Sequence, residues 1–248
     1  MRTSIGKLIF TGDFIIDRSW TDEWRTENWT HWTDIVSHEL DAVCINTASN
    51  SGTIKQMSNN VDESVRKYNP THVIYNGGAF DLYSKVYSVD EIVSSIEFMN
   101  IVFYESGYKC AYLFVPIDAS AYGSSINGDF LDLRKKLQAM FKKYGDIFID
   151  MNGSELGTVG NLKKTMYIDG INLSEEGQMA VAKRVSKVIA ESFSEEIQTN
   201  TTEPPSGKVV CKSDGRPIFI KVNNTYKPLA IGDENDTDNA ICKIKWRC

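Results

Sequence analysis

The stretch KLIFTGDF, residues 7–14, is a short apolar run that ends in a glycine and a carboxylate. Four further short apolar runs follow it along the chain: AVCIN (42–46), HVIYN (72–76), CAYLFVP (110–116) and DIFID (146–150). Continuous apolar runs of this length, bounded by turn residues, are typical of strands that are buried on both faces. The sequence therefore predicts a sheet of five buried strands.

Between these runs, apolar residues recur at helical spacing. The helical segments cover residues 28–40, 53–68, 88–107, 131–141 and 174–189. Ser88, with Glu91 three positions later, forms the capping-box pattern of a helix start. Connections of this length join parallel strands by right-handed crossovers, so we expect a three-layer α/β/α fold with a parallel five-stranded sheet. Functional residues of such sheets lie at the carboxyl ends of the strands.

The character of the chain changes near residue 198. We expect the sheet domain at 1–197, a polar linker with two prolines at 198–207, and a small β-meander module at 208–248. About 40 residues bury too little surface to be stable alone. The module would dock on the first domain, pack on a partner chain or be held by a disulfide, and the sequence leaves open whether any bridge joins its three cysteines, Cys211, Cys242 and Cys248.

The composition is that of an ordinary soluble globular protein. The 248 residues are 42% apolar and 24% charged, and the formal charge is −6. A scattered acidic excess argues against a protein that binds the nucleic-acid backbone. No apolar run is long enough to span a membrane, and the N-terminus does not resemble a secretory signal, so the chain is expected to be soluble and leaderless. With three histidines and no CxxC spacing, neither a metal site nor a cofactor is expected.

Four segments at the predicted strand ends stand in a recognisable order. They are Gly12–Ile15, Ala48–Thr53, Gly78–Leu82 and Asp169–Ser174. Together they resemble the four blocks of the SGNH (GDSL) hydrolases, a family of esterases, lipases and carbohydrate deacetylases, over about residues 7–192. The resemblance implies a serine nucleophile after Gly-Asp, a histidine base three residues after an aspartate, and an oxyanion hole that includes a glycine amide and an asparagine side chain.

This sequence departs from the family pattern at the reacting groups. Phe14 stands at the nucleophile position, Phe80 at the oxyanion asparagine and Asn172 at the base. The retained residues, which would mainly brace the loops, are Gly12, Asp13, Gly52, Asp81 and Asp169. A phenyl ring cannot attack a carbonyl, and an amide is not a base near neutral pH. We therefore expect a catalytically inactive domain, with the two rings filling part of the substrate space.

Other residues could supply the missing chemistry. Thr11 and Ser19 lie near the first block and are the candidate replacement nucleophiles. The three histidines are expected to be structural or surface residues, and His72 falls at the wrong end of its strand. They are His31, His38 and His72.

Aromatic residues near the strand ends could form a sugar-stacking surface. The binding candidates are Trp20, Trp24, Tyr83 and Tyr87. Part of this cluster is expected to be core, because Trp29 and Trp32 lie on the apolar face of the first helix. The acidic run 233–239, DENDTDN, lacks the pattern of a calcium loop and is expected to be a solvated turn.

The C-terminal segment IFIKVNNTYKPLAI, residues 218–231, resembles short β repeats of bacteriophage tail and fibre proteins. The leading hypothesis is thus an inactive SGNH-like structural, assembly or receptor-binding component of a virion, with other protein subunits in many copies and a cell-surface glycan as partners. The alternative is an active carbohydrate esterase or deacetylase with a non-standard catalytic set. A third hypothesis is a binding protein outside any virion.

Overall fold

The computed structural model describes residues 6–17, 30–123, 125–199, 219–222 and 225–228 of the chain. The chain divides into two compact units, Met1–Glu196 and Ile197–Cys248. The larger unit holds the main sheet and its helices, and the described residues of the smaller unit are the end of the last helix and one hairpin.

Five parallel strands form the main sheet in the order β2-β1-β3-β4-β5. They are β1 (Lys7–Thr11), β2 (Val43–Asn46), β3 (His72–Tyr75), β4 (Lys109–Phe114) and β5 (Ile147–Asp150). Leu8 of β1 pairs with Cys44 on one side and with His72 on the other. Because the chain leaves β1 towards β2 and then returns to β3 on the opposite side, the loops at the carboxyl ends of these strands diverge, which is where open α/β sheets bind ligands.

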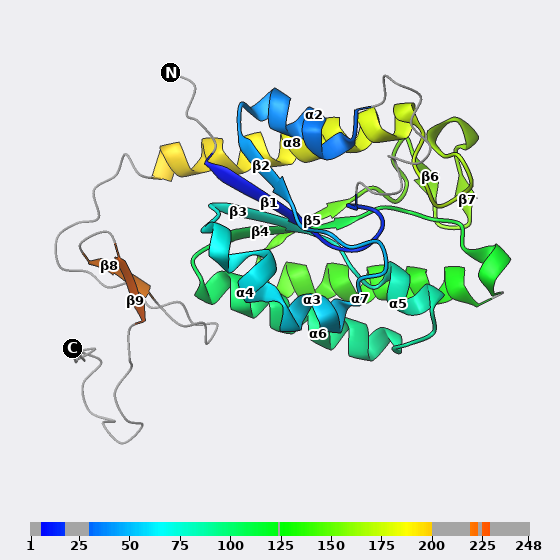
Figure 1. Ribbon diagram of the computed structural model, residues 1–248, viewed down its shortest axis with the longest axis horizontal. Helices are drawn as coiled ribbons and strands as arrows, with labels where there is room; N and C mark the ends of the chain where they lie inside the picture. The colour runs from blue at the N-terminus through cyan, green and yellow to red at the C-terminus, as the bar shows by residue number, and fades with distance from the viewer. Residues whose placement is uncertain (1–5, 18–29, 124, 200–218, 223–224, 229–248) are drawn as a thin grey trace. The chain divides into compact units, whose positions relative to one another are not determined.

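Helices cover both faces of the sheet, which confirms the predicted three-layer fold. On one face lie α2 (Trp32–Leu40) and α8 (Glu175–Thr199) (Figure 1). On the other lie α3 (Ile54–Asn59), α4 (Val61–Ser64), α5 (Ala79–Tyr83), α6 (Val89–Glu105) and α7 (Ile126–Tyr144). The predicted capping box of Ser88 and Glu91 starts α6. Helix α8 runs two residues into the segment predicted as a linker.

The core forms between the sheet and these helices. Trp32 is fully buried on α2, and its ring meets Phe10 of β1 edge to face, with 5.1 Å between the ring centroids. Its indole Nε1 donates a hydrogen bond to the carbonyl of Ile15. Trp32 is therefore a core residue, as predicted, whereas Trp20, Trp24 and Trp29 lie outside the described residues.

The prediction of one helix over residues 53–68 is wrong. The structure has α3, α4 and a separate 3₁₀ turn at Arg66–Tyr68. Asn60, with φ −104° and ψ 13°, ends α3. Asparagine has a low helix propensity, and the Asn60 backbone leaves the helical conformation although its side chain makes no capping hydrogen bond.

A small hairpin after β5 was not predicted. Its strands are β6 (Gly157–Thr158) and β7 (Asn161–Leu162), which pair antiparallel. Strands of two residues are too short to show an alternating apolar pattern.

The second unit contains β8 (Phe219–Val222) and β9 (Thr225–Pro228), which pair antiparallel with Phe219 opposite Pro228. This hairpin confirms two of the strands predicted for residues 208–248. The remaining predicted strands, the acidic run 233–239 and the three C-terminal cysteines lie outside the described residues. Cys44 and Cys110 are free thiols and half-buried.

Candidate functional site

The loops at the carboxyl edge of the sheet enclose a pocket of about 240 Å³. Its lining is Phe14, Asn50, Ser51, Phe80, Tyr83, Tyr122, Asp169, Ile171 and Asn172. The three positions that depart from the SGNH pattern thus lie in one pocket, as the resemblance implied. The two phenylalanine rings form part of the pocket wall. That they fill part of the space for a substrate stays a prediction.

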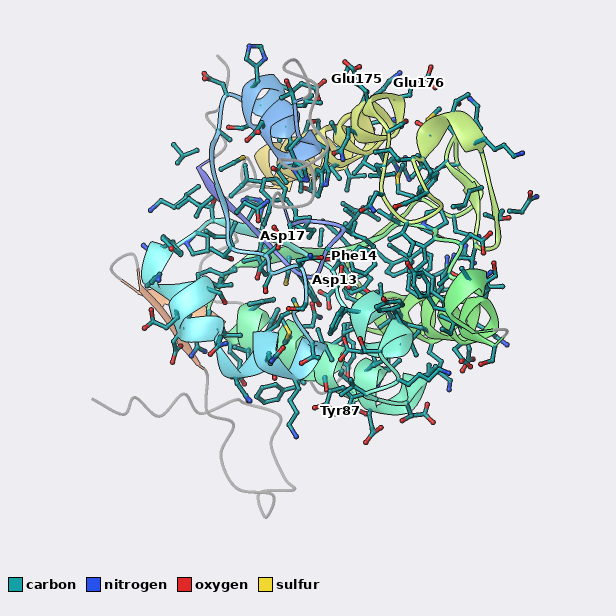
Figure 2. The ribbon with its side chains drawn as sticks, turned by 45° about the vertical axis from the view of Figure 1, so that its right-hand side comes forward. Asp13, Phe14, Asp17, Tyr87, Glu175 and Glu176 are labelled. Carbon is teal, nitrogen blue, oxygen red and sulfur yellow. The ribbon has the colours of Figure 1, made fainter. Side chains whose placement is uncertain are left out.

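Asp13 braces the loop that carries Phe14 (Figure 2). Its carboxylate is fully buried, and Oδ1 accepts hydrogen bonds from Asn76 Nδ2 at 2.6 Å and from the Ile15 amide at 3.2 Å. Oδ2 accepts from the Phe80 amide at 3.3 Å. Asn76 Oδ1 in turn accepts from the Asp13 amide at 3.1 Å. These bonds join the loops after β1 and β3 and hold Phe14 and Phe80 on the same pocket.

Asp81 is a second buried carboxylate behind the pocket. Both of its oxygens accept from the Ile54 amide, at 3.1 and 3.2 Å, which ties α5 to the start of α3. Burial raises the pKa of Asp81 to about 6, and the nearby charge of Asp13 acts in the same direction. Burial also raises the pKa of Asp13, although the hydrogen bond from Asn76 opposes this shift.

The raised pKa of Asp81 predicts that this residue contributes more to the free energy of unfolding at acidic pH than at neutral pH. Because the folded pKa of Asp81 lies above its unfolded value of 3.8, the folded protein binds a proton more tightly than the unfolded chain does between about pH 4 and 6. We expect the parent to gain about 2–3 kcal/mol of unfolding free energy relative to Asp81→Asn as the pH falls from 7 to 4. Urea unfolding of both proteins at several pH values measures this difference.

The exposed Asp62→Asn is the matched control, since Asp62 forms only a surface ion pair with Arg66. Its difference from the parent should change little over the same range. A constant difference between the parent and Asp81→Asn would contradict the prediction.

Asp169 keeps the geometry of an orienting carboxylate. Its Oδ1 accepts from the amides of Ile171 and Asn172, at 2.9 and 2.7 Å, and its Oδ2 accepts from Asn172 Nδ2 at 2.7 Å. In the family pattern this carboxylate would hold the ring of a histidine base. Here it holds a carboxamide, which cannot take up a proton near neutral pH.

The hydrogen-bond donors that the family resemblance implies for an oxyanion hole are also not available in this pocket. The Gly52 amide donates to the Ser49 carbonyl at 2.9 Å, so it is used inside the turn after β2. Phe80 has no side-chain donor in place of the asparagine. The pocket therefore lacks both of these oxyanion donors, the glycine amide and the asparagine side chain, that the resemblance implied.

Of the two candidate replacement nucleophiles, only Thr11 lies among the described residues, and it does not line the pocket. Thr11 is 3% exposed and lines a separate crevice of about 290 Å³, and Ser19 lies outside the described residues. The hydroxyl groups that do line the pocket belong to Ser51, Tyr83 and Tyr122.

None of the three histidines lines this pocket. His31 caps the start of α2 by accepting from the Thr33 amide, His38 lies further along α2, and His72 begins β3 at the amino edge of the sheet. Within the described part of the chain, no group of three or more His, Cys, Asp or Glu side chains could hold a metal ion.

The structure separates the two tyrosines that were predicted to share a binding surface. Tyr83 lies in the pocket, with its ring centroid 4.4 Å from that of Tyr122. Tyr87 lines a different groove together with Lys55 and Phe98, and Figure 2 shows it well away from Phe14. Trp20 and Trp24 lie outside the described residues, so a joint surface of the four is not observed.

Sequence reasoning did not single out Asn76 or Tyr122, and it named Ser51 only as part of the block Ala48–Thr53. Asn76 could have been noticed as a polar residue directly after a buried strand. Ser51 lies in a turn and Tyr122 in the short 3₁₀ helix Ser120–Tyr122, where no periodic pattern shows which side chains point inwards.

Comparison with solved structures shows that other proteins have the same fold. A GDSL-like lipase from Bacteroides thetaiotaomicron superposes with a TM-score of 0.63 at 15% identity, covering 75% of this chain and 88% of that chain. The chain has the GDSL-hydrolase fold. An acetyl xylan esterase gives 0.60 at 14% identity over 74% of this chain and 99% of that chain. A catalytic mutant of an acetylxylan esterase from Geobacillus stearothermophilus gives 0.58 at 14% identity, over 75% and 95%.

Likenesses at this level of identity concern the fold alone. No sequence profile of a protein family and no curated protein matches the chain. The names lipase and acetyl xylan esterase describe those proteins. Among the residues that the structure describes, no helix is both long and apolar enough to cross a bilayer.

Proposed function

We propose that this chain is a binding protein on the GDSL-hydrolase fold, whose pocket holds a small ligand without the acyl transfer of the family. The observation that supports this function is that Phe14, Phe80 and Asn172 line one pocket in place of a nucleophile, an oxyanion donor and a base. Removing the nucleophile and base of a triad leaves only residual positioning effects. The loops that shape the pocket are nevertheless fully braced, by Asp13 and Asp169.

An active esterase is the second candidate, and the names of the GDSL-fold structures favour it. Such an enzyme would need a nucleophile in the pocket, and among the described residues Ser51 is the only aliphatic hydroxyl that lines it. A serine hydroxyl is a weak nucleophile unless a base activates it. The pocket lining contains one carboxylate, Asp169, whose two oxygens already accept three hydrogen bonds.

Hydrolysis of 4-nitrophenyl acetate by the purified full chain separates the two candidates. We expect a rate equal to that of an unrelated protein at the same concentration, because no described group can both attack the ester and pass on its proton. Release of nitrophenolate, followed by absorbance, measures this rate. A rate well above the blank that Ser51→Ala abolishes would overturn the binding function and establish the esterase.

We also propose an assembly role for the second unit, as a component of a virion or another multi-copy particle. The hairpin of β8 and β9 supports this role, because two strands alone are marginally stable in water and gain from burial against a partner. The mass of the native particle decides between this role and that of a monomeric binding protein.

A further inference from the structure

The pocket has an aromatic wall made of four rings. Phe14, Phe80, Tyr83 and Tyr122 all line it. The Tyr83 and Tyr122 rings meet at 88° with 4.4 Å between their centroids, and Phe80 lies 6.2 Å from Tyr83 at 52°. Rings set at steep angles to one another make a concave corner and not a flat stacking platform. Such a corner suits a compact, rounded ligand group better than a planar one.

The described part of the pocket lining carries a negative charge. Among the described residues that line the pocket, Asp169 is the one carboxylate, and none is a lysine, arginine or histidine. The groups that donate hydrogen bonds to Asp169 are neutral: two backbone amides and the carboxamide of Asn172. These neighbours therefore fix the orientation of the Asp169 carboxylate, but they do not neutralise its negative charge.

We propose that this pocket binds a small organic cation, namely a quaternary or methylated ammonium group. Aromatic faces carry negative electrostatic potential and attract cations within about 6 Å of the ring centroid, and cages of several rings are the usual receptors for quaternary ammonium groups. Asp169 adds a full negative charge at the same site. A volume of about 240 Å³ is below the usual range for drug-sized ligands, and it suits a headgroup of this kind.

The departures from the family pattern all change the electrostatics in the same direction. An acyl-transfer pocket must stabilise a negative oxyanion and holds a base that becomes positive. Here Phe80 removes a donor, Phe14 adds a ring, and Asn172 cannot acquire a positive charge. The resulting pocket disfavours an oxyanion and favours a cation. This inference rests on the proposed binding function and names its ligand class.

A matched pair of ligands tests the proposal on the full chain. Choline and 3,3-dimethylbutan-1-ol have almost the same shape, but only choline carries a charge. In calorimetric titrations we expect choline to bind about tenfold more tightly than the neutral alcohol, or better. Equal affinities, or no binding of choline at millimolar concentration, would overturn the proposal.

Variants at Tyr122 locate the binding site. This side chain is 49% exposed, so its substitution should not disturb folding. We expect Tyr122→Leu to weaken choline binding several-fold, while Tyr122→Phe, which keeps the ring, binds as the parent does. Tyr87→Leu, in the separate groove, is the control and should change nothing. If Tyr122→Leu binds choline as tightly as the parent, the assigned site is wrong.

Acetylcholine separates the failure of this inference from the failure of the proposed function. Binding of acetylcholine without acetate release supports both the recognition of the cation and the non-hydrolytic binding function. Acetate release would overturn the non-hydrolytic function, and a preference over 3,3-dimethylbutyl acetate would still support recognition of the cation.

Discussion

Replacing Asp13 with alanine is expected to lower the free energy of unfolding of the sheet unit by about 3–5 kcal/mol. The buried carboxylate accepts hydrogen bonds from Asn76, Ile15 and Phe80. Alanine leaves all three donors without a partner in a region that water does not reach. Each buried unpaired donor costs about 1–3 kcal/mol, and part of this cost is recovered as the loops relax.

The variant Asp13→Asn tests whether the loss of stability depends on the number of hydrogen bonds removed. Its remaining oxygen can keep the bonds from Asn76 and Ile15, while its NH₂ group faces the Phe80 amide, so one bond is lost and not three. We expect a loss of about 1–2 kcal/mol, between the parent and the alanine variant. Urea unfolding followed by circular dichroism measures the order of the three proteins. The exposed Asp62→Ala is the control, with a loss within about 0.5 kcal/mol.

A different order of stability would contradict the role given to this network. If Asp13→Ala is within about 1 kcal/mol of the parent, the three donors find other partners, and the loops after β1 and β3 do not depend on Asp13. The shape of the pocket would then need another cause. Because Phe80 is held through its own amide, loss of this network should also weaken ligand binding in the pocket.

Strands β1, β3 and β4 could be predicted from the sequence because they are buried on both faces. The prediction of five buried strands is wrong for β2 and β5, which lie at the two edges of the sheet and are only partly buried. Strands β1 and β3 are short apolar runs that stop at Gly12 and Asn76, where the chain leaves the core. Helix α6 was equally predictable, since its capping box is a local pattern. In both cases the interactions that decide the structure lie within a few residues of one another, or follow directly from burial.

Elements whose structure depends on the backbone conformation of single residues could not be predicted. The apolar spacing of residues 53–68 fits one helix, but the backbone breaks at Asn60. The pair β6–β7 depends on turn glycines such as Gly157, with φ +94°, and not on apolar pattern. A spacing rule describes which side chains share a face, and it does not show where the backbone changes direction.

The candidate site could also be predicted in part from the sequence. Phe14, Phe80 and Asn172 follow or precede buried elements at one edge of the sheet, and the fold brings them together. Tyr83 and Tyr87 seemed equally close, but Lys85 adopts φ +54°, a left-handed conformation that turns the chain between them. Non-glycine residues rarely adopt this conformation, so the separation of the two tyrosines has no signal in the sequence.

Restoring the three family residues is expected to create hydrolysis. The combined variant Phe14→Ser, Phe80→Asn and Asn172→His should cleave 4-nitrophenyl acetate about 10²-fold faster than the parent, or more. Asp169 already accepts a hydrogen bond from the side chain at position 172, at 2.7 Å. A histidine ring there can donate to the same oxygen, and that bond fixes its orientation as a base.

The control carries the same changes at positions 80 and 172 but Phe14→Ala in place of Phe14→Ser. It has the base and the amide donor without a nucleophile, so its rate should stay at the parent level. Circular dichroism of each variant shows whether the fold is kept. A folded serine variant that is no faster than the alanine control would contradict the prediction, because the loops would then lack the geometry of the family. A rate that depends on the serine would mean that the backbone of this pocket still supports acyl transfer, and that three side chains alone prevent it.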